Sequence, residues 1–403
     1  MRSLSSLGVA VSAAAIFLNA AVGCTTNSDS GTSGTGANAD ELFEPGPYEV
    51  GYREMALTYS SAGSMEPREI VLRVWYPAQD GSGAGPAQYA VAGIVDIPAG
   101  IALEAPPVTD DEALPLVVYS HGNGGEGLLA YPYGELMASH GWVLVAPNHT
   151  GNTALDLAIG PADPSALVAL DRPTDITAII DEFDSGLSGD ELEGKADVAL
   201  GVYLFGHSFG GYTSFTAGGA DVDYDTLSAD CEGQTSDNCD VLTDPNIEAA
   251  YQAGFGDPRI VAIAPQAPAL VAIAEGELAA LGIPSLLMTG TLDQTTTFEE
   301  SAQPSWAGID DPDDIWVNMP LGAHYSFISV CHDLPPDILA LFIDDADLDG
   351  CSPDFIDTRD AVPVLAAYVL AFGRRHVLGQ TEWDDVLTGP PLGDPGDFVV
   401  TAK

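Results

Sequence analysis

The hexapeptide GHSFGG (206–211) carries the residue types of a nucleophilic serine held on a sharp turn. It follows the apolar run VALGVYLF (198–205) and precedes a stretch rich in alanine, glycine and aromatic residues (209–220), so it lies between a predicted strand and a predicted helix. Glycines on both sides of the serine fit a turn whose backbone is too crowded for side chains. We therefore predict that Ser208 is a nucleophile. The alternative is a glycine-rich turn in which the serine is only a local cap.

A serine hydroxyl is a weak nucleophile at neutral pH, so it needs a histidine to accept its proton and a carboxylate to orient that histidine. In chains with such a turn, the acid and then the histidine can follow the serine. Asp293 lies three residues after the expected strand end at Gly290, and His324 follows the apolar run at 314–320. We predict Asp293 as the acid and His324 as the base. A strand-end cap and an ordinary loop histidine are the alternatives.

The other histidines fit the role of the base less well. His140 ends a helix that precedes a strand, which is the wrong end of the sheet, and His376 lies on the last predicted helix. His332 is a rival, but it lies inside a loop bounded by cysteines. His149 follows an early strand and is a candidate to line the site. His207 is part of the turn itself and cannot swing back to the serine beside it.

Acyl transfer also needs backbone N–H groups aimed at the oxygen that becomes negatively charged. The residue after the nucleophile, Phe209, supplies one donor in such turns. The loop SHGNGG (120–125) follows an apolar run and is expected to supply the other donor. We predict Asn123 for this role, with Gly122 and Gly124 as alternatives. A plain glycine-rich turn is the competing interpretation of this loop.

Apolar runs that alternate with helical stretches must position these residues. An antiparallel hairpin is predicted from 53–59 and 68–77. Strands covered on both faces are predicted at 114–120, 141–147, 198–205, 259–265, 283–290 and 314–320. Helices are predicted near 127–140, 173–184, 209–219, 296–302 and 357–377. This alternation predicts an α/β fold with a mostly parallel, twisted sheet, an N-terminal antiparallel hairpin and helices on both faces.

Two acidic segments, 221–257 and 331–356, interrupt the pattern, and each carries one pair of cysteines. When Cys24 near the N-terminus is set aside, four cysteines remain, and an even number of cysteines in an exported chain predicts disulfides. Of the three possible connectivities we predict the sequence-local pairs Cys231–Cys239 and Cys331–Cys351. Both segments flank the carboxyl ends of strands, where ligands bind in open α/β sheets. They are expected either to form the walls or lid of a pocket or to be decoration.

An aspartate-rich stretch lies within the second of these segments. Asp345, Asp347 and Asp349 precede Gly350 in a D-x-D-x-D-G pattern, which is how a calcium loop begins. Its twelfth position would be Ile356, where a bidentate glutamate is required. We therefore favour a solvated acidic loop, with structural calcium as the alternative, and we expect no cofactor.

The composition restricts the partners. Of the 403 residues, 60 are acidic and 11 are basic, which gives a net charge of −49. Such a surface repels nucleic acids and anionic membranes, so neither is expected to bind. With 46% hydrophobic residues, the chain is long enough for one large core.

The N-terminal residues resemble a targeting segment. Arg2 precedes an apolar stretch (7–22), and small residues lead up to Cys24. This pattern predicts a signal peptide over 1–24 with Cys24 as a lipidated lipoprotein cysteine, and cleavage of a plain signal peptide is the alternative. Residues 25–43 are predicted to be a flexible linker and 44–403 the catalytic domain. We expect a cell-envelope lipoprotein, periplasmic or at the cell surface, or a secreted protein, with membrane contact only through the lipid anchor.

Taken together, these motifs resemble the α/β-hydrolase superfamily, and within it the predicted dienelactone hydrolases and the platelet-activating-factor acetylhydrolase-like lipases. The matching pieces run in family order: LRVWYPA (72–78), VVYSHGNGG (117–125), APNHTGNT (146–153), GHSFGG (206–211), TGTLDQTT (289–296) and GAHYSF (322–327). The resemblance implies Ser208 as nucleophile, His324 as base and Asp293 as acid, in an esterase or lipase for short or oxidised acyl chains. Dienelactone hydrolases proper use a cysteine nucleophile, so the serine argues against that reaction.

We therefore expect an exported serine esterase or lipase that cleaves small-molecule or lipid esters through an acyl-enzyme intermediate. One alternative is a polyester or cutinase-like hydrolase. From a different class, the alternative is a non-catalytic surface binding protein on a hydrolase fold.

Overall fold

The computed structural model describes residues 37–403, except for 62, 64, 161, 230, 232–233, 235, 274 and 344–345. The predicted signal peptide, the lipidation site Cys24 and the linker as far as residue 36 lie outside the described residues and stay predictions. In the part of the chain that is described, no helix combines the length and the apolar character that a membrane span requires.

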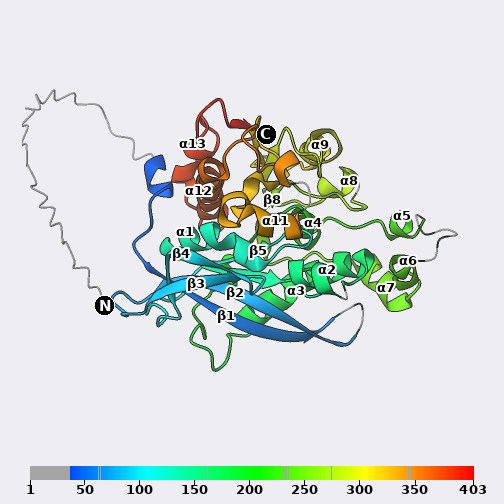
Figure 1. Ribbon diagram of the computed structural model, residues 1–403, viewed down its shortest axis with the longest axis horizontal. Helices are drawn as coiled ribbons and strands as arrows, with labels where there is room; N and C mark the ends of the chain where they lie inside the picture. Colours follow the sequence, from blue (N-terminus) through cyan, green and yellow to red (C-terminus); the bar gives the residue numbers. More distant parts are fainter. Residues whose placement is uncertain are drawn as a thin grey trace, which may run out of the picture. The chain divides into compact units, whose positions relative to one another are not determined.

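Strands in the described residues form one mixed sheet of eleven (Figure 1). They are β1 (Glu49–Ser60), β2 (Pro67–Ala78), β3 (Pro86–Val91), β4 (Val95–Glu104), β5 (Leu116–Ser120), β6 (Val143–Asn148), β7 (Val202–His207), β8 (Ile260–Gln266), β9 (Leu286–Gly290), β10 (Ile315–Met319) and β11 (Val399–Ala402). Their order across the sheet is β11-β10-β9-β8-β7-β5-β6-β2-β1-β4-β3. From β10 to β6 in this order every pair is parallel, whereas β1 and β2 form an antiparallel hairpin. The predicted α/β fold is confirmed.

Thirteen α-helices connect or flank these strands in the described residues. They are α1 (Tyr131–Ser139), α2 (Ala154–Ile159), α3 (Ser165–Asp184), α4 (Phe209–Gly218), α5 (Tyr224–Ala229), α6 (Asp237–Val241), α7 (Pro245–Ala253), α8 (Glu275–Leu278), α9 (Gln303–Gly308), α10 (Val330–Asp333), α11 (Pro336–Phe342), α12 (Thr358–His376) and α13 (Asp384–Leu387). Short turns of 3₁₀-helix are η1 (Ala39–Leu42), η2 (Gly127–Ala130), η3 (Val198–Leu200), η5 (His324–Phe327), η6 (Ala346–Leu348) and η7 (Thr381–Trp383), and η4 (Phe298–Ala302) is a π-helical turn.

Helices cover both faces of the sheet. Side chains of α1 and α12 form one core with Val117 and Tyr119 of β5, and side chains of α3 and α4 form the other core with Leu116 and Val118. Successive side chains of a strand point to opposite faces, so β5 is buried along its whole length. Figure 1 shows α1 and α12 on one side of the strands and α3 on the other.

The helix predicted at 173–184 begins earlier, at Ser165, and continues through Pro173. A proline inside a helix has no N–H and leaves the carbonyl four residues before it without its helical partner. Here that carbonyl, of Ala169, accepts a hydrogen bond of 3.0 Å from the Tyr212 hydroxyl on α4. A contact between two helices therefore offsets the break that the proline would otherwise cause.

Two more elements differ from the sequence prediction. The run at 198–205 becomes a strand only at Val202, because Gly201 has a positive φ of 93° and ends the turn η3. The hairpin of β3 and β4 was not predicted, since it contains Pro86 and Pro98. It lies at the edge of the sheet, where proline is tolerated because fewer backbone N–H groups are needed.

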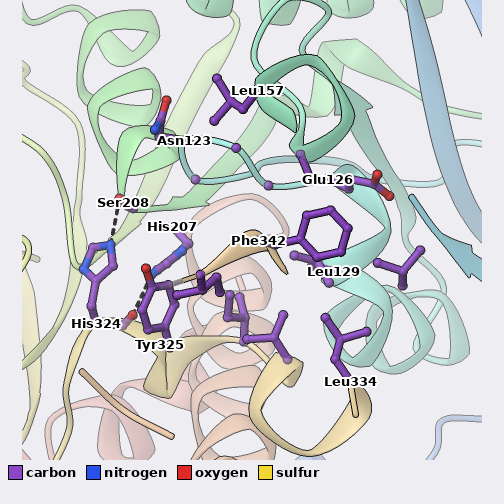
Figure 2. Close-up of a pocket in the computed structure, with 18 of the residues that line it drawn as sticks. Asn123, Glu126, Leu129, Leu157, His207, Ser208, His324, Tyr325, Leu334 and Phe342 are labelled. Atoms are coloured by element: carbon purple, nitrogen blue, oxygen red, sulfur yellow. Dashed lines mark hydrogen bonds between the residues drawn. The ribbon is translucent and has the colours of Figure 1, made fainter. Parts of the chain in front are cut away.

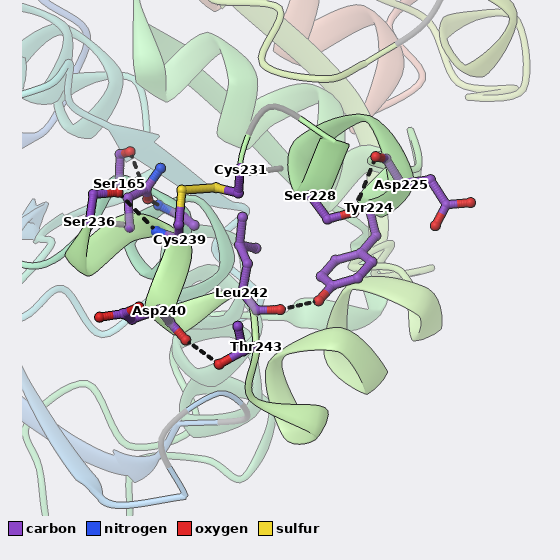
Figure 3. The surroundings of a disulfide bond; sticks show 12 residues. Ser165, Tyr224, Asp225, Ser228, Cys231, Ser236, Cys239, Asp240, Leu242 and Thr243 are labelled. Atoms are coloured by element: carbon purple, nitrogen blue, oxygen red, sulfur yellow. Dashed lines mark hydrogen bonds between the residues drawn. A yellow bond between two sulfur atoms is a disulfide. The ribbon is translucent and has the colours of Figure 1, made fainter. Parts of the chain in front are cut away.

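Both predicted disulfides are confirmed. Cys231–Cys239 joins the segment after α5 to α6. Beside it, the Tyr224 hydroxyl donates a hydrogen bond to the Leu242 carbonyl (Figure 3). Cys331–Cys351 joins α10 to the segment after η6. Each bond crosslinks one of the two acidic segments internally.

Candidate active site

The turn between β7 and α4 holds Ser208 in a conformation that side chains rarely adopt, with φ 57° and ψ −113°. A Cβ atom on Gly210 would lie 1.8 Å from the Ser120 carbonyl oxygen, and one on Gly206 would lie 2.6 Å from the same oxygen. The Ser208 amide donates to the Gln266 carbonyl of β8 at 2.8 Å. Close packing against β5 and β8 therefore forces this turn, and only glycine fits two residues before and two residues after the serine.

Ser208, His324 and Asp293 form a continuous chain of hydrogen bonds. His324 Nε2 lies 2.9 Å from Ser208 Oγ, as Figure 2 shows, and His324 Nδ1 lies 3.0 Å from Asp293 Oδ2. When Nδ1 carries the proton that is donated to the carboxylate, Nε2 is left to accept the serine proton. The structure thus brings together the three residues that the sequence singles out, from three separate loops.

Asp293 is held by the residues that follow it. Its Oδ1 accepts hydrogen bonds from the amides of Thr295 at 2.9 Å and Thr296 at 2.7 Å. Its Oδ2 accepts one from the Thr296 hydroxyl at 2.8 Å, besides its contact with His324. These donors fix the orientation of the carboxylate toward the imidazole.

Asp349 connects the loop that contains Asp293 to the loop that contains His324. Its side chain is buried, and its Oδ1 accepts from the amides of His324 and Gln294, both at 3.0 Å. Its Oδ2 accepts from the Thr295 hydroxyl at 2.8 Å. Asp349 is thus a supporting residue whose role the sequence did not reveal, because its partners lie 25 and 55 positions away.

The interpretation of the aspartate-rich stretch at 345–350 therefore needs a correction. The favoured interpretation, a solvated acidic loop, is wrong for Asp349, which is only 2% exposed. Asp347 is exposed, and Asp345 lies outside the described residues. No group of three or more histidine, cysteine, aspartate or glutamate side chains within the described ranges could hold a metal ion.

The loop at 120–125 faces the turn across the cavity. The amides of Asn123 and Phe209 donate to no other group in the described part of the chain, so both are free to bind an oxygen atom of a ligand. The Gly124 amide donates to the Asn152 carbonyl at 3.2 Å, which removes Gly124 from the candidate donors. Figure 2 shows Asn123 beside Ser208 at the cavity.

A cavity of about 470 Å³ opens onto Ser208 and His324. Most of its other lining residues are apolar: Val91, Ala92, Leu129, Ala154, Leu157, Ile328, Val330, Leu334, Phe342 and Ile343. The segment 331–356 contributes Leu334, Phe342 and Ile343, so it forms a wall of the pocket (Figure 2). No described residue of the other acidic segment, 221–257, lines this cavity.

The other histidines do not reach Ser208. His207 Nε2 bonds to the His324 carbonyl at 2.7 Å, and burial, together with the nearby His324, lowers the pKa of His207 to about 3. His332 contacts Asp333 and Thr358 instead. His149, a candidate to line the site, is fully buried and does not line the cavity.

His149 belongs to a second chain of the same residue types, which the sequence did not predict. Ser120 Oγ lies 2.9 Å from His149 Nε2, and His149 Nδ1 lies 2.7 Å from Asp175 Oδ2. All three side chains are fully buried. Burial and the charge of Arg172 lower the pKa of His149 to about 4, so this imidazole is neutral at pH 7.

The comparisons with known proteins agree with this geometry. Residues 90–159 match the sequence model of the family "Platelet-activating factor acetylhydrolase, isoform II". The matched range contains the loop at 120–125 but none of Ser208, Asp293 and His324. No protein with a curated function matches the chain.

Among solved structures, a ferulic acid esterase from Streptomyces cinnamoneus is similar, with a TM-score of 0.61 and 19% sequence identity. The match covers 88% of this chain and 96% of the esterase. Together with the parallel sheet and the strand-to-helix turn at Ser208, this likeness shows that the chain has the α/β-hydrolase fold, as the resemblance in its motifs implies.

Proposed function

We propose that the protein is a hydrolase of carboxylic esters in which Ser208 is the nucleophile, His324 the base and Asp293 the orienting acid. The observation that carries this proposal is the Ser208–His324–Asp293 hydrogen-bonded chain at the edge of an apolar cavity. The partial match to an acetylhydrolase family and the likeness to an esterase support the same reaction.

In the first half of the reaction, Ser208 Oγ attacks the ester carbonyl carbon while His324 Nε2 takes the hydroxyl proton. The carbonyl oxygen becomes negatively charged and is bound by the free amides of Phe209 and Asn123. When the C–O bond to the alcohol breaks, His324 returns its proton to the leaving oxygen and the acyl group stays on Ser208. Water then repeats the sequence and releases the acid.

The cavity favours uncharged esters with apolar acyl groups. Its apolar side chains gain free energy from burial of hydrocarbon, roughly 25 cal/mol per Å². The net charge of −49 disfavours anionic substrates by long-range repulsion. We therefore assign short-chain or lipid-type acyl esters as the substrate class.

We also propose that the protein is exported and carries a lipid on Cys24. The two disulfides support export, since such bonds persist in oxidising compartments. Expression in a bacterial host followed by mass spectrometry of the mature N-terminus tests the proposal. A mature chain that begins at a diacylated Cys24 is expected, and an uncleaved or unmodified N-terminus contradicts it.

The enzymatic proposal is tested with a series of p-nitrophenyl esters of increasing acyl length, together with a feruloyl ester because of the structural neighbour. We expect turnover of the neutral aliphatic esters with an optimum in chain length, which identifies the acyl specificity. A folded protein that hydrolyses none of these esters contradicts the proposal and favours a non-catalytic binding protein.

A further inference from the structure

Arg172 on α3 is fully buried and forms no ion pair with a carboxylate among the described residues, although the charge of Asp175 acts on it from a longer distance. Each of the other arginines in the described residues forms an ion pair with an aspartate or glutamate: Arg53, Arg68, Arg73, Arg259, Arg359, Arg374 and Arg375. A buried charge without an ionic partner is costly, and an apolar side chain of similar size is often more stable in such a place. A role beyond stability would explain why this arginine is retained.

The guanidinium group holds the loop that carries Asn123. It donates to the His121 carbonyl and, at 2.8 Å, to Asn152 Oδ1. Asn152 in turn donates from Nδ2 to Asn123 Oδ1 at 2.7 Å, and its carbonyl accepts from the Gly124 amide at 3.2 Å. Asn152 therefore holds the Asn123 side chain and the peptide that follows it, while Arg172 holds Asn152 and the His121 carbonyl that precedes Asn123.

The same guanidinium group lies against the turn that carries Ser208. Its central carbon is 4.8 Å from the centre of the Phe209 ring, within the range of a cation–π contact. Its Nε lies 3.4 Å from the Thr213 hydroxyl, and that hydroxyl donates to the Phe209 carbonyl at 3.0 Å. Arg172 thus touches the residue after the nucleophile as well as the opposite loop.

We propose that Arg172 is a positioning residue that sets the spacing of the two oxyanion donors, the amides of Asn123 and Phe209, and does so on the loop side through Asn152. This inference rests on the proposed esterase function. The role concerns the position of these two amides, which must point at the oxygen where negative charge develops.

The test compares Arg172→Met and Asn152→Ala with the wild type. The readouts are kcat and KM for a p-nitrophenyl ester and the inhibition constant of phenylboronic acid, which forms a tetrahedral anionic adduct with a nucleophilic serine. We expect kcat to fall about 10²-fold in Arg172→Met and about 10-fold in Asn152→Ala, while KM changes less than about threefold. The affinity for the boronic acid should fall in parallel with kcat/KM.

Arg374→Met is the matched control. Arg374 lies near the end of α12, stacks at 4.8 Å on Trp383 and pairs with the exposed Glu41, so its loss removes a comparable cation–π contact away from the cavity. We expect its kcat and its affinity for the boronic acid to stay within about twofold of the wild-type values.

A folded Arg172→Met protein with the kcat and boronic acid affinity of the control overturns the inference, and so does a loss confined to KM. If Arg172→Met does not fold, Asn152→Ala decides, and unchanged kcat and inhibition in that variant overturn the inference. A folded wild-type protein without esterase activity overturns the proposed function itself and the role of Arg172 with it. If the wild-type protein is active and both variants keep its kcat and its affinity for the boronic acid, only the role of Arg172 is overturned.

Discussion

The described residues contain two hydrogen-bonded chains of a serine, a histidine and an aspartate, and the distances within them are nearly the same. We call them the cavity-facing chain and the buried chain. In the first, the serine-to-histidine and histidine-to-aspartate distances are 2.9 and 3.0 Å, for Ser208–His324–Asp293. In the second they are 2.9 and 2.7 Å, for Ser120–His149–Asp175. Hydrogen-bond distances alone therefore cannot assign different roles to the two chains.

The surroundings of the two chains differ. Ser208 lines a cavity, lies on a turn with positive φ and faces two free amides, whereas Ser120 ends the buried strand β5 and lines no part of that cavity. Asp175 of the buried chain also binds Arg68 at 2.8 Å, so its carboxylate belongs to an ion-pair network. We therefore assign reactivity to Ser208, which has access to the cavity and to oxyanion donors, and we assign the buried chain to stability.

The largest expected effect separates the two serines. Ser208→Ala removes the nucleophile, so hydrolysis of p-nitrophenyl acetate should fall by at least about 10⁴-fold. Ser120→Ala removes only a buried hydroxyl and should retain activity within about 10-fold. Comparable activity losses in the two variants, measured as kcat/KM on folded protein, would contradict the assignment of the roles.

Breaking the buried chain should cost stability. Asp175→Ala leaves His149 without its buried carboxylate and Arg68 without the nearer of its two buried partners, since only Asp171 at 3.4 Å remains. We expect the free energy of unfolding to fall by about 3–5 kcal/mol. Asp181→Ala is the control, because it removes an exposed ion pair with Arg259 and should cost less than about 1 kcal/mol. Urea denaturation measures both, and equal losses would refute a structural role for the buried chain.

Loss of a support in the cavity-facing chain should affect turnover more than stability. Asp349→Ala removes the carboxylate that binds the His324 amide, and the shifted imidazole should lower kcat by about 10- to 10²-fold. Asp347→Ala, two positions earlier and exposed, should leave kcat unchanged. If both variants keep wild-type kcat, the proposed support by Asp349 is wrong.

The pH dependence of stability should reflect the buried histidines. Burial lowers the pKa of His149 to about 4 and of His207 to about 3, so below pH 6.5 the unfolded chain takes up protons that the folded chain does not. Stability should therefore fall as the pH decreases from about 6.5 to 4, by up to about 1.4 kcal/mol per pH unit for each of these histidines.

Several buried carboxyl groups oppose this pH dependence. Burial raises the pKa of Asp171 and of Asp314 to about 6, and it also raises the pKa of Asp163, Glu126 and Glu135. These groups bind a proton more readily in the folded state and offset part of the loss at low pH. Unfolding free energies measured by urea between pH 7 and pH 4.5 test the balance. Values that stay constant or rise toward pH 4.5 would contradict a net contribution from the buried histidines.

The residues of the cavity-facing chain could be predicted because each belongs to a local signal. Ser208 lies on a glycine-flanked turn, and Asp293 and His324 follow apolar strands. Asp349 and Arg172 could not be predicted, because their roles come from contacts between segments that are far apart in the sequence. The same reason hid the continuation of α3 through its proline, which depends on a hydroxyl from α4.

The central claim, that Ser208 and not Ser120 is the reactive serine, is tested most directly by labelling with a fluorophosphonate probe and mapping the modified peptide by mass spectrometry. We predict one labelled site, at Ser208, which is absent in Ser208→Ala and retained in Ser120→Ala. A label on Ser120 or on another serine, or an active enzyme that takes up no label, would contradict this assignment.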